Sequence, residues 1–233
     1  MRVEERGRRR AGVRRRVVAL VANAALIAAA SLCAHAAPIS RADLTALCIE
    51  AEDAAQCGRL VEARKLRALS RIAERDGNEL RVSLSPFGLT IFRDSANVRG
   101  TRSYAIWDYV EDLDTLVLFT TNGDRSGFML VQRHGGGEYG IPAEPVFSPD
   151  RARFVTVDVC PRDCDDEIAV WRVGPESVAK EAVWRPPADW TDASATWRGD
   201  GRIAIEYQSA GDSASHTVER RLADPSWQRP RAK

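Results

Sequence analysis

The chain has 233 residues, of which 34 are Lys or Arg and 33 are Asp or Glu, so its formal net charge is +1. Eight of the arginines and two of the glutamates lie in the first 16 residues, and removing residues 1–36 leaves 26 basic and 31 acidic residues, a net charge of −5. The remaining chain lacks the basic footprint of a nucleic-acid binder, which excludes that class.

The first 36 residues are typical of a bacterial secretory signal. A basic stretch is followed by an apolar one over 17–32, and Ala34-His35-Ala36 places small residues where signal peptidase cleaves. We therefore expect cleavage before Ala37 and a periplasmic or secreted protein. The alternative is an uncleaved membrane anchor, because 17–37 approaches the length of a spanning helix.

Four cysteines follow the signal, and in an oxidising compartment they predict disulfides: Cys48, Cys57, Cys160 and Cys164. Residues 42–74 are rich in Ala, Leu, Arg and Glu, which predicts helix. In one straight helix Cys48 and Cys57 would lie ~13 Å apart, too far to bond. Pairing them requires a break near 52–55. We favour this helical hairpin, with a second bridge closing the tight loop at Cys160 and Cys164, over a straight helix held by crossed bridges.

An acidic loop accompanies the second cysteine pair, with Asp163, Asp165 and Asp166 as candidate binding residues. Metal binding by the cysteines would need thiolates, and no histidine lies nearby, so a structural disulfide is the preferred interpretation. Carboxylates could ligate calcium, but the loop lacks the pattern of an EF-hand. We expect no metal and no other cofactor.

Residues 78–228 predict an all-β domain, because short alternating runs are separated by Gly, Asp and Pro. The expected strands are 79–84, 89–93, 104–110, 115–121, 128–133, 154–159, 167–173, 178–184, 195–198, 203–208 and 217–222. In this scheme 37–77 form an N-terminal helical segment and 229–233 a disordered tail. Strands that follow helices, rather than alternating with them, define a mainly β fold.

A weak internal repeat runs through the β region. Pro145–Asp150 precedes one expected strand, and Ala193–Asp200 precedes another. The two segments end at aspartates fifty residues apart, and a repeat of ~40–50 residues is typical of propeller blades. Phe147–Asp150, with Arg153-Phe154-Val155 and Ile168–Arg172, resembles the WD40-like repeat of TolB-type secreted bacterial propellers. Arg151 stands where that repeat has glycine, so we expect the turn to take another form.

The number of repeats limits the architecture. Closed propellers have ~4–8 blades, and the β region can supply three or three and a half. We therefore expect a partial, open propeller-like array of antiparallel sheets, with the helical hairpin covering an unpaired edge. A β-sandwich is the alternative.

Two short motifs resemble parts of hydrolase sites. His134–Gly137 resembles the oxyanion loop of lipases and Gly211-Asp212-Ser213 the nucleophile block of GDS hydrolases, but the elbow and parallel sheet of those families are missing from the pattern. After cleavage His134 and His216 are the two remaining histidines. We interpret His134 as part of a glycine turn and 211–215 as a mobile loop, and expect no catalytic residues.

Tryptophans supply the other candidate binding surface. Trp184 and Trp190 flank a proline-containing loop, where they could present a ledge for a peptide or glycan. The competing interpretation, which we prefer, packs Trp184 and Trp197 in strand cores and uses Trp190 to plug a sheet edge, because aromatic residues supply much of a small β domain's burial.

These features favour a noncatalytic interaction module whose partner is an envelope protein or a cell-wall component. Two alternatives stay open. An envelope hydrolase would bring two carboxylates together in one concave pocket. A secreted inhibitor would use Cys48–Glu74, since Cys48 and Cys57 resemble the cysteine pair of LprI-like lysozyme inhibitors; deletion of 37–75 should then leave the β domain folded.

Overall fold

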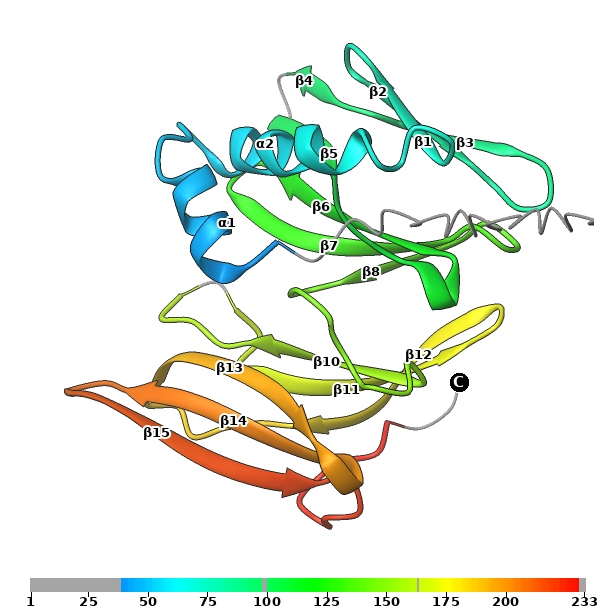
Figure 1. The fold of residues 1–233 in the computed structure, drawn as a ribbon. Helices are drawn as coiled ribbons and strands as arrows, with labels where there is room; N and C mark the ends of the chain where they lie inside the picture. The colour runs from blue at the N-terminus through cyan, green and yellow to red at the C-terminus, as the bar shows by residue number, and fades with distance from the viewer. Residues whose placement is uncertain (1–38, 98–99, 163, 231–233) are drawn as a thin grey trace, which may run out of the picture. The chain divides into compact units, whose positions relative to one another are not determined.

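A computed structural model describes residues 39–97, 100–162 and 164–230. The expected signal and cleavage site, together with Asp163, lie outside the described residues. Two helices precede four antiparallel sheets, which confirms the mainly β fold with open sheets (Figure 1). None of the described helices is both long and apolar enough to cross a membrane.

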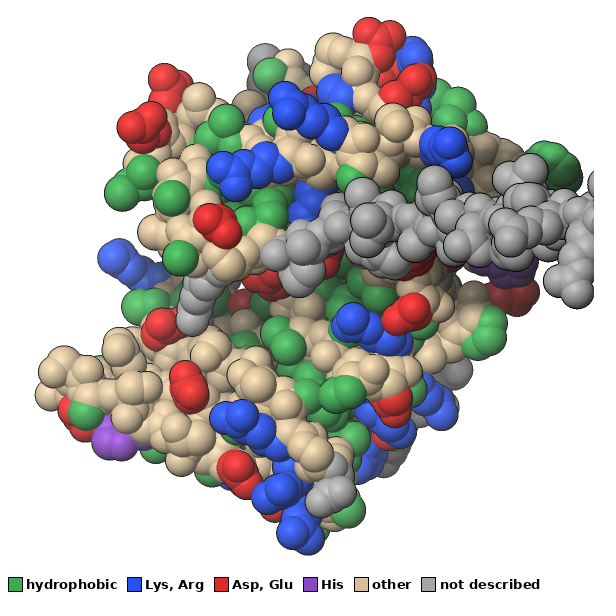
Figure 2. Space-filling view, viewed as in Figure 1, with side chains coloured by type: hydrophobic (Ala, Val, Ile, Leu, Met, Phe, Trp, Pro, Cys, Tyr) green, Lys and Arg blue, Asp and Glu red, His purple; other side chains and the backbone are tan. Residues whose placement is uncertain are grey.

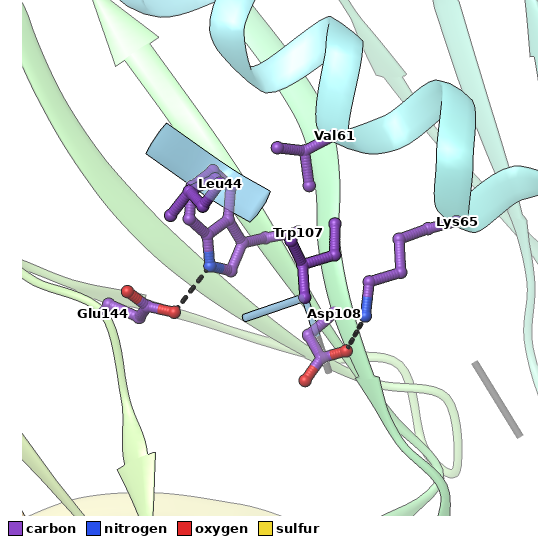
Figure 3. A pocket seen from close by; sticks show the side chains of 7 residues that line it. Leu44, Val61, Lys65, Trp107, Asp108 and Glu144 are labelled. Atoms are coloured by element: carbon purple, nitrogen blue, oxygen red, sulfur yellow. Dashed lines mark hydrogen bonds and ion pairs between the residues drawn. The ribbon is translucent and has the colours of Figure 1, made fainter. Parts of the chain in front are cut away.

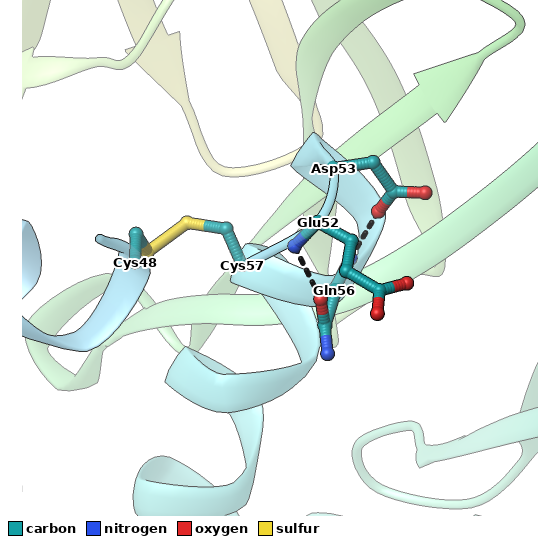
Figure 4. Close-up of a disulfide and its surroundings, with 5 residues drawn as sticks. All are labelled: Cys48, Glu52, Asp53, Gln56 and Cys57. Carbon is teal, nitrogen blue, oxygen red and sulfur yellow. Dashed lines mark hydrogen bonds between the residues drawn. A yellow bond between two sulfur atoms is a disulfide. The ribbon is translucent and has the colours of Figure 1, made fainter. Parts of the chain in front are cut away.

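The helical hairpin and both disulfides are present as expected. Helix α1 (Arg41–Cys48) ends where the chain turns, and α2 (Ala54–Leu66) begins after Asp53, whose carboxylate accepts the N–H of Gln56 at 2.7 Å. Cys48 and Cys57 are bonded across this break, with their Cα atoms 4.9 Å apart (Figure 4). Cys160 and Cys164 form the second bridge.

Helix α2 ends at Leu66, eight residues before the expected end at Glu74. Ala73–Asp76 instead forms strand β1, which pairs with β2 and starts the first sheet before the expected boundary at 78. Leu69 and Ala73 are buried in the core by this arrangement. Strand pairing and burial therefore override the helical propensity of the segment.

The four sheets follow one another along the chain, and in each of them consecutive strands are neighbours. The first holds β1, β2 (Glu79–Ser83) and β3 (Leu89–Arg93). The second holds β4 (Ser95–Asn97), β5 (Gly100–Val110), β6 (Thr115–Asn122), β7 (Arg125–Gln132) and β8 (Gly137–Ile141). The third holds β9 (Val146–Phe147), β10 (Arg153–Asp158), β11 (Glu167–Gly174) and β12 (Ser177–Trp184). The fourth holds β13 (Trp190–Arg198), β14 (Arg202–Ser209) and β15 (Asp212–Arg221).

Three apolar clusters join these sheets in chain order. Leu80 of the first sheet packs in one cluster with Leu118 of the second. The opposite face of the second sheet meets the third around Phe154, and the other face of the third meets the fourth around Val170 and Ile203. The two middle sheets thus bury both faces, which explains why β6 and β11 are nearly continuous apolar runs.

Helix α2 is an integral part of this core. Gly58 lets it approach the second sheet closely, because a Cβ at this position would lie 2.8 Å from the ring of Phe119. The buried carboxylate of Glu62 accepts hydrogen bonds from Arg75 at 2.8 Å and from the N–H of Ile106 at 2.9 Å. Deleting 37–75 would remove these contacts and β1, so the β region is not expected to stay folded without the segment.

The turn at Arg151 keeps the conformation that glycine would favour. Arg151 has a φ of 58°, in the left-handed region, so the expectation of a different turn is wrong. Local side chains hold it there: Asp150 accepts the N–H of Ala152 at 3.1 Å, and the hydroxyl of Ser148 accepts the N–H of Arg153 at 3.0 Å.

The segment 211–215 is largely strand rather than the expected mobile loop. β15 begins at Asp212, which pairs with Ser209, and His216 pairs with Tyr207 across the same hairpin. A turn at Ala210 and Gly211, with Gly211 at a φ of 83°, sets this register. At the end of the chain, Arg229 of the expected tail forms an ion pair with Glu181, and 231–233 lie outside the described residues.

Candidate functional site

The acidic loop forms no metal site among the residues that the structure describes. Asp165 and Asp166 follow the Cys160–Cys164 bridge, and the N–H of Asp165 donates to the carboxylate of Asp158 at 3.1 Å. Burial, with the nearby charges of Asp165, Glu167 and Asp166, raises the pKa of Asp158. Within the described ranges, no three His, Cys, Asp or Glu side chains are arranged to hold a metal ion.

The two tryptophans contribute to packing between the third and fourth sheets. Trp190 is buried, with its ring stacked on Tyr207 at a centroid distance of 3.7 Å and edge-on to Trp184 at 5.4 Å. The guanidinium of Arg220 lies 3.9 Å from the centre of the Trp184 ring. Trp190 therefore offers no open ledge, and only the half-buried Trp184 retains partial exposure.

The two histidines lie in different parts of the fold. His134 sits in the turn between β7 and β8 and forms a backbone bridge with Ser85. The Nε2 of His216 on β15 lies 2.8 Å from the carboxylate of Asp212, in an exposed pair. In the part of the chain that the structure describes, neither imidazole is hydrogen-bonded to a hydroxyl, so the nucleophile–base contact of a serine hydrolase is not formed.

A small cavity beside the helices contains two carboxylates (Figure 3). Asp108 accepts a hydrogen bond from the buried ammonium of Lys65 at 2.6 Å, and Glu144 accepts one from the indole of Trp107 at 2.7 Å. The cavity volume is about 60 Å³, whereas ligand sites usually measure ~300–1,000 Å³. Because both carboxylates already have protein partners and the space is small, this cavity is a poor site for a sugar ring.

A larger cleft of about 280 Å³ lies between two turns that occupy corresponding positions in the internal sequence repeat. One side is lined by Ser148, Pro149, Asp150 and Arg153, and the other by Trp197, Arg198, Gly199, Gly201 and Leu222. Asp150 is the single carboxylate among the described lining side chains, and hydrogen bonds from Ser148 and from the backbone of Ala152 lower its pKa. The described lining side chains therefore do not include the pair of carboxylates that glycoside hydrolysis requires.

The largest unexplained feature is a row of exposed apolar side chains on the first sheet. Phe87 is 92% exposed, Leu89 56% and Ile91 36%, all within five residues of chain. Leu89 and Ile91 belong to β3, which ends the sheet order β1-β2-β3, and Phe87 lies in the hairpin turn before it. We call these three residues the β3 apolar row. Exposed apolar groups gathered at one place typically mark an interaction surface.

Charges of both signs border this row. On the same face of the sheet Arg81 lies opposite Ile91 and forms ion pairs with Glu74, Asp76 and Glu79. The face of the molecule in Figure 2 likewise shows acidic and basic side chains intermingled. The surroundings of the row are therefore polar, as in the rim of a protein interface.

Comparison with known proteins identifies no relative of this chain: no family model, no curated protein and no solved structure matches it.

Sequence reasoning missed the β3 apolar row. Leu89, Thr90, Ile91 and Phe92 place apolar side chains on both faces of the strand, so the pattern alone cannot distinguish the buried face from the exposed one. Phe87 stands between Pro86 and Gly88, two residues typical of turns, which mask its role. The sequence signal for this surface is Phe87 itself, because a large aromatic residue at the tip of a hairpin has no core to enter.

Proposed function

We propose that this protein is a noncatalytic interaction module of the periplasm or cell exterior, and that the β3 apolar row is its partner-binding surface. The row carries the proposal because Phe87, Leu89 and Ile91 are apolar, adjacent and exposed at a sheet edge. Natural sheets usually protect such edges with charges, bulges or proline, whereas Leu89 and Ile91 make most of this edge apolar, and an edge of this kind is a template for another chain.

Packing energetics support the same surface. Each of these side chains gains roughly 25 cal/mol for every Å² of apolar area that a partner removes from water. Phe87 has the most to gain, since nearly all of its surface faces solvent. A buried aromatic anchor with smaller apolar neighbours is the usual composition of an interface hot spot.

The extracytoplasmic location has separate support. Two disulfides, Cys48–Cys57 and Cys160–Cys164, suit an oxidising compartment. The basic and apolar stretches at the start of the sequence agree with export. The partner is expected among the proteins or cell-wall components of that compartment.

Capture from an envelope extract tests the proposal. The chain from Ala37 to Lys233 serves as bait beside a triple variant, Phe87→Ser with Leu89→Thr and Ile91→Thr, and a matched control, Ile49→Ser, which removes a 76% exposed apolar side chain elsewhere. We expect the triple variant to lose its captured proteins at least tenfold and the control to retain them, with all three baits equally folded by circular dichroism.

Equal capture by the triple variant would overturn the row as the binding surface. The noncatalytic part of the proposal has its own test. Turnover of an ester, glycan or peptide substrate by the purified protein, abolished by replacing His134 or His216, would contradict it.

A further inference from the structure

We infer that the β3 edge binds an extended segment of a partner protein as a fourth strand of the first sheet, and that this segment carries alternating apolar side chains and a carboxylate that meets Arg93. The inference rests on the proposed function and specifies the chemistry of the partner. It follows from three features of β3: its backbone, its side-chain alternation and its charge.

The backbone of β3 presents a row of hydrogen-bonding groups away from the sheet. At one end of the β2–β3 ladder Leu84 donates to the carbonyl of Gly88 at 3.0 Å, and at the other Asp94 donates to that of Asn78 at 2.8 Å. In an antiparallel ladder residues alternate between facing the neighbour and facing away. Leu89, Ile91 and Arg93 therefore direct their N–H and C=O groups outward.

Those outward groups have no partner strand among the described residues, because β3 ends its sheet. A segment in extended conformation would satisfy them directly, as in recognition by strand addition. The edge is five residues long, or roughly 17 Å, which suits a short peptide segment better than a large flat interface.

Side-chain alternation defines what the added strand should contain. Leu89, Ile91 and Arg93 lie on the outer face of the sheet, whereas Phe92 is buried beneath it. Side chains directly opposite each other on adjacent strands form contact pairs. The partner therefore needs apolar side chains opposite Leu89 and Ile91, at alternate positions of its own chain.

The charge of Arg93 indicates which side chain the added strand needs at its third contact position. The side chain of Arg93 is 64% exposed, and its Nε donates to Glu79 at 2.8 Å. Its two terminal nitrogens have no partner within the described ranges, so they can receive a carboxylate from the added strand. In a parallel arrangement, the expected five-residue sequence of the segment is apolar–any–apolar–any–acidic. In an antiparallel arrangement, the order is reversed.

A second copy of this chain fits the edge less well. Antiparallel pairing centred on Ile91 would place Arg93 opposite Leu89 of the other copy, which supplies no carboxylate. Pairing centred on Arg93 would bring like charges together. The charge of Arg93 therefore favours another protein, rather than a second copy of this chain, as the source of the added strand.

Synthetic peptides provide the test. Fluorescent peptides with two alternating valines and a glutamate, in both orders, are titrated against the chain from Ala37 to Lys233 and read by anisotropy. The matched peptides replace glutamate with lysine, or carry N-methyl groups on the residues whose N–H would face β3. We expect saturable binding of one order, weakened at least tenfold by N-methylation and about fivefold by lysine.

A charge exchange completes the test. Arg93→Glu, combined with Glu79→Gln so that two glutamates do not face each other across β2 and β3, is expected to weaken binding of the glutamate peptide and to restore binding of the lysine peptide. Unchanged binding after N-methylation overturns strand addition. A dimer in sedimentation that dissociates with Leu89→Thr and Ile91→Thr overturns the heterologous partner. In either case capture that still depends on the β3 apolar row would leave the proposed function intact.

Discussion

The two end sheets of the molecule leave very different strands at their outer edges. β15, the last strand of the fourth sheet, is mostly exposed and almost wholly polar, with Asp212 and His216 paired on it. β3, the last strand of the first sheet, exposes Leu89 and Ile91. The polar edge follows the common protection against unwanted pairing, and its presence in the same protein shows that this chain can build such an edge. The apolar edge is therefore a feature to explain by binding.

The two ends are also anchored by different interactions. Next to the first sheet, α2 is held by the ion pair between the buried carboxylate of Glu62 and the half-buried guanidinium of Arg75. Next to the fourth sheet, aromatic side chains dominate, with Trp190 and Trp227 both buried in the shared cluster. Both ends are packed through apolar clusters, and the end that carries the apolar edge adds a buried ion pair to this packing.

The largest effect is expected from Glu62→Gln at the ion-anchored end. The substitution removes the charge that Nε and Nη2 of Arg75 each contact at 2.8 Å, leaving a largely buried guanidinium without its bidentate partner. We expect a loss of about 3–5 kcal/mol in the free energy of unfolding, measured with urea. Glu74→Gln removes a 67% exposed carboxylate and is the matched control, with an expected change under about 1 kcal/mol. Equal losses in the two variants would show that the buried pair is not the anchor.

A smaller effect of opposite sign is expected from Arg151→Gly, in the turn that lies near the fourth sheet. Arg151 holds a φ of 58°, which costs an L-residue about 1–2 kcal/mol, and glycine gives back part of this through its greater freedom in the unfolded chain. We expect a gain of about 0.5–1 kcal/mol in the same urea measurement. Arg151→Ala keeps the strained backbone, so an alanine variant as stable as the glycine variant would contradict this account.

Several parts of the fold could be predicted from the sequence because local chemistry determines them. The span of a straight helix excludes a Cys48–Cys57 bond, so the bond required the break that the structure contains. The strands expected at 79–84 and 89–93 are marked by local alternation between Gly, Asp and Pro residues, and β2 and β3 lie within those bounds. Each of these inferences used residues close together in the chain.

Features set by distant residues could not be predicted in this way. Glu62 sits in a charged helix and gives no sign that its carboxylate is buried against Arg75 and Ile106. β1 forms because β2 pairs with it, against the helical preference of its own residues. The exposure of Leu89 and Ile91 depends on which face of the sheet meets the second sheet, and alternation alone does not contain that information.

Amide hydrogen exchange resolved by NMR tests most directly whether β3 is an open edge that binds a partner. In the free protein we expect fast exchange at Leu89, Ile91 and Arg93 and slow exchange at Thr90 and Phe92, because only the latter two face β2. Adding the captured partner or the binding peptide should slow the three outward amides of β3 and leave those of β15 unchanged. Protection of all five β3 amides in the free protein, or protection that appears on β15 instead, would contradict the account.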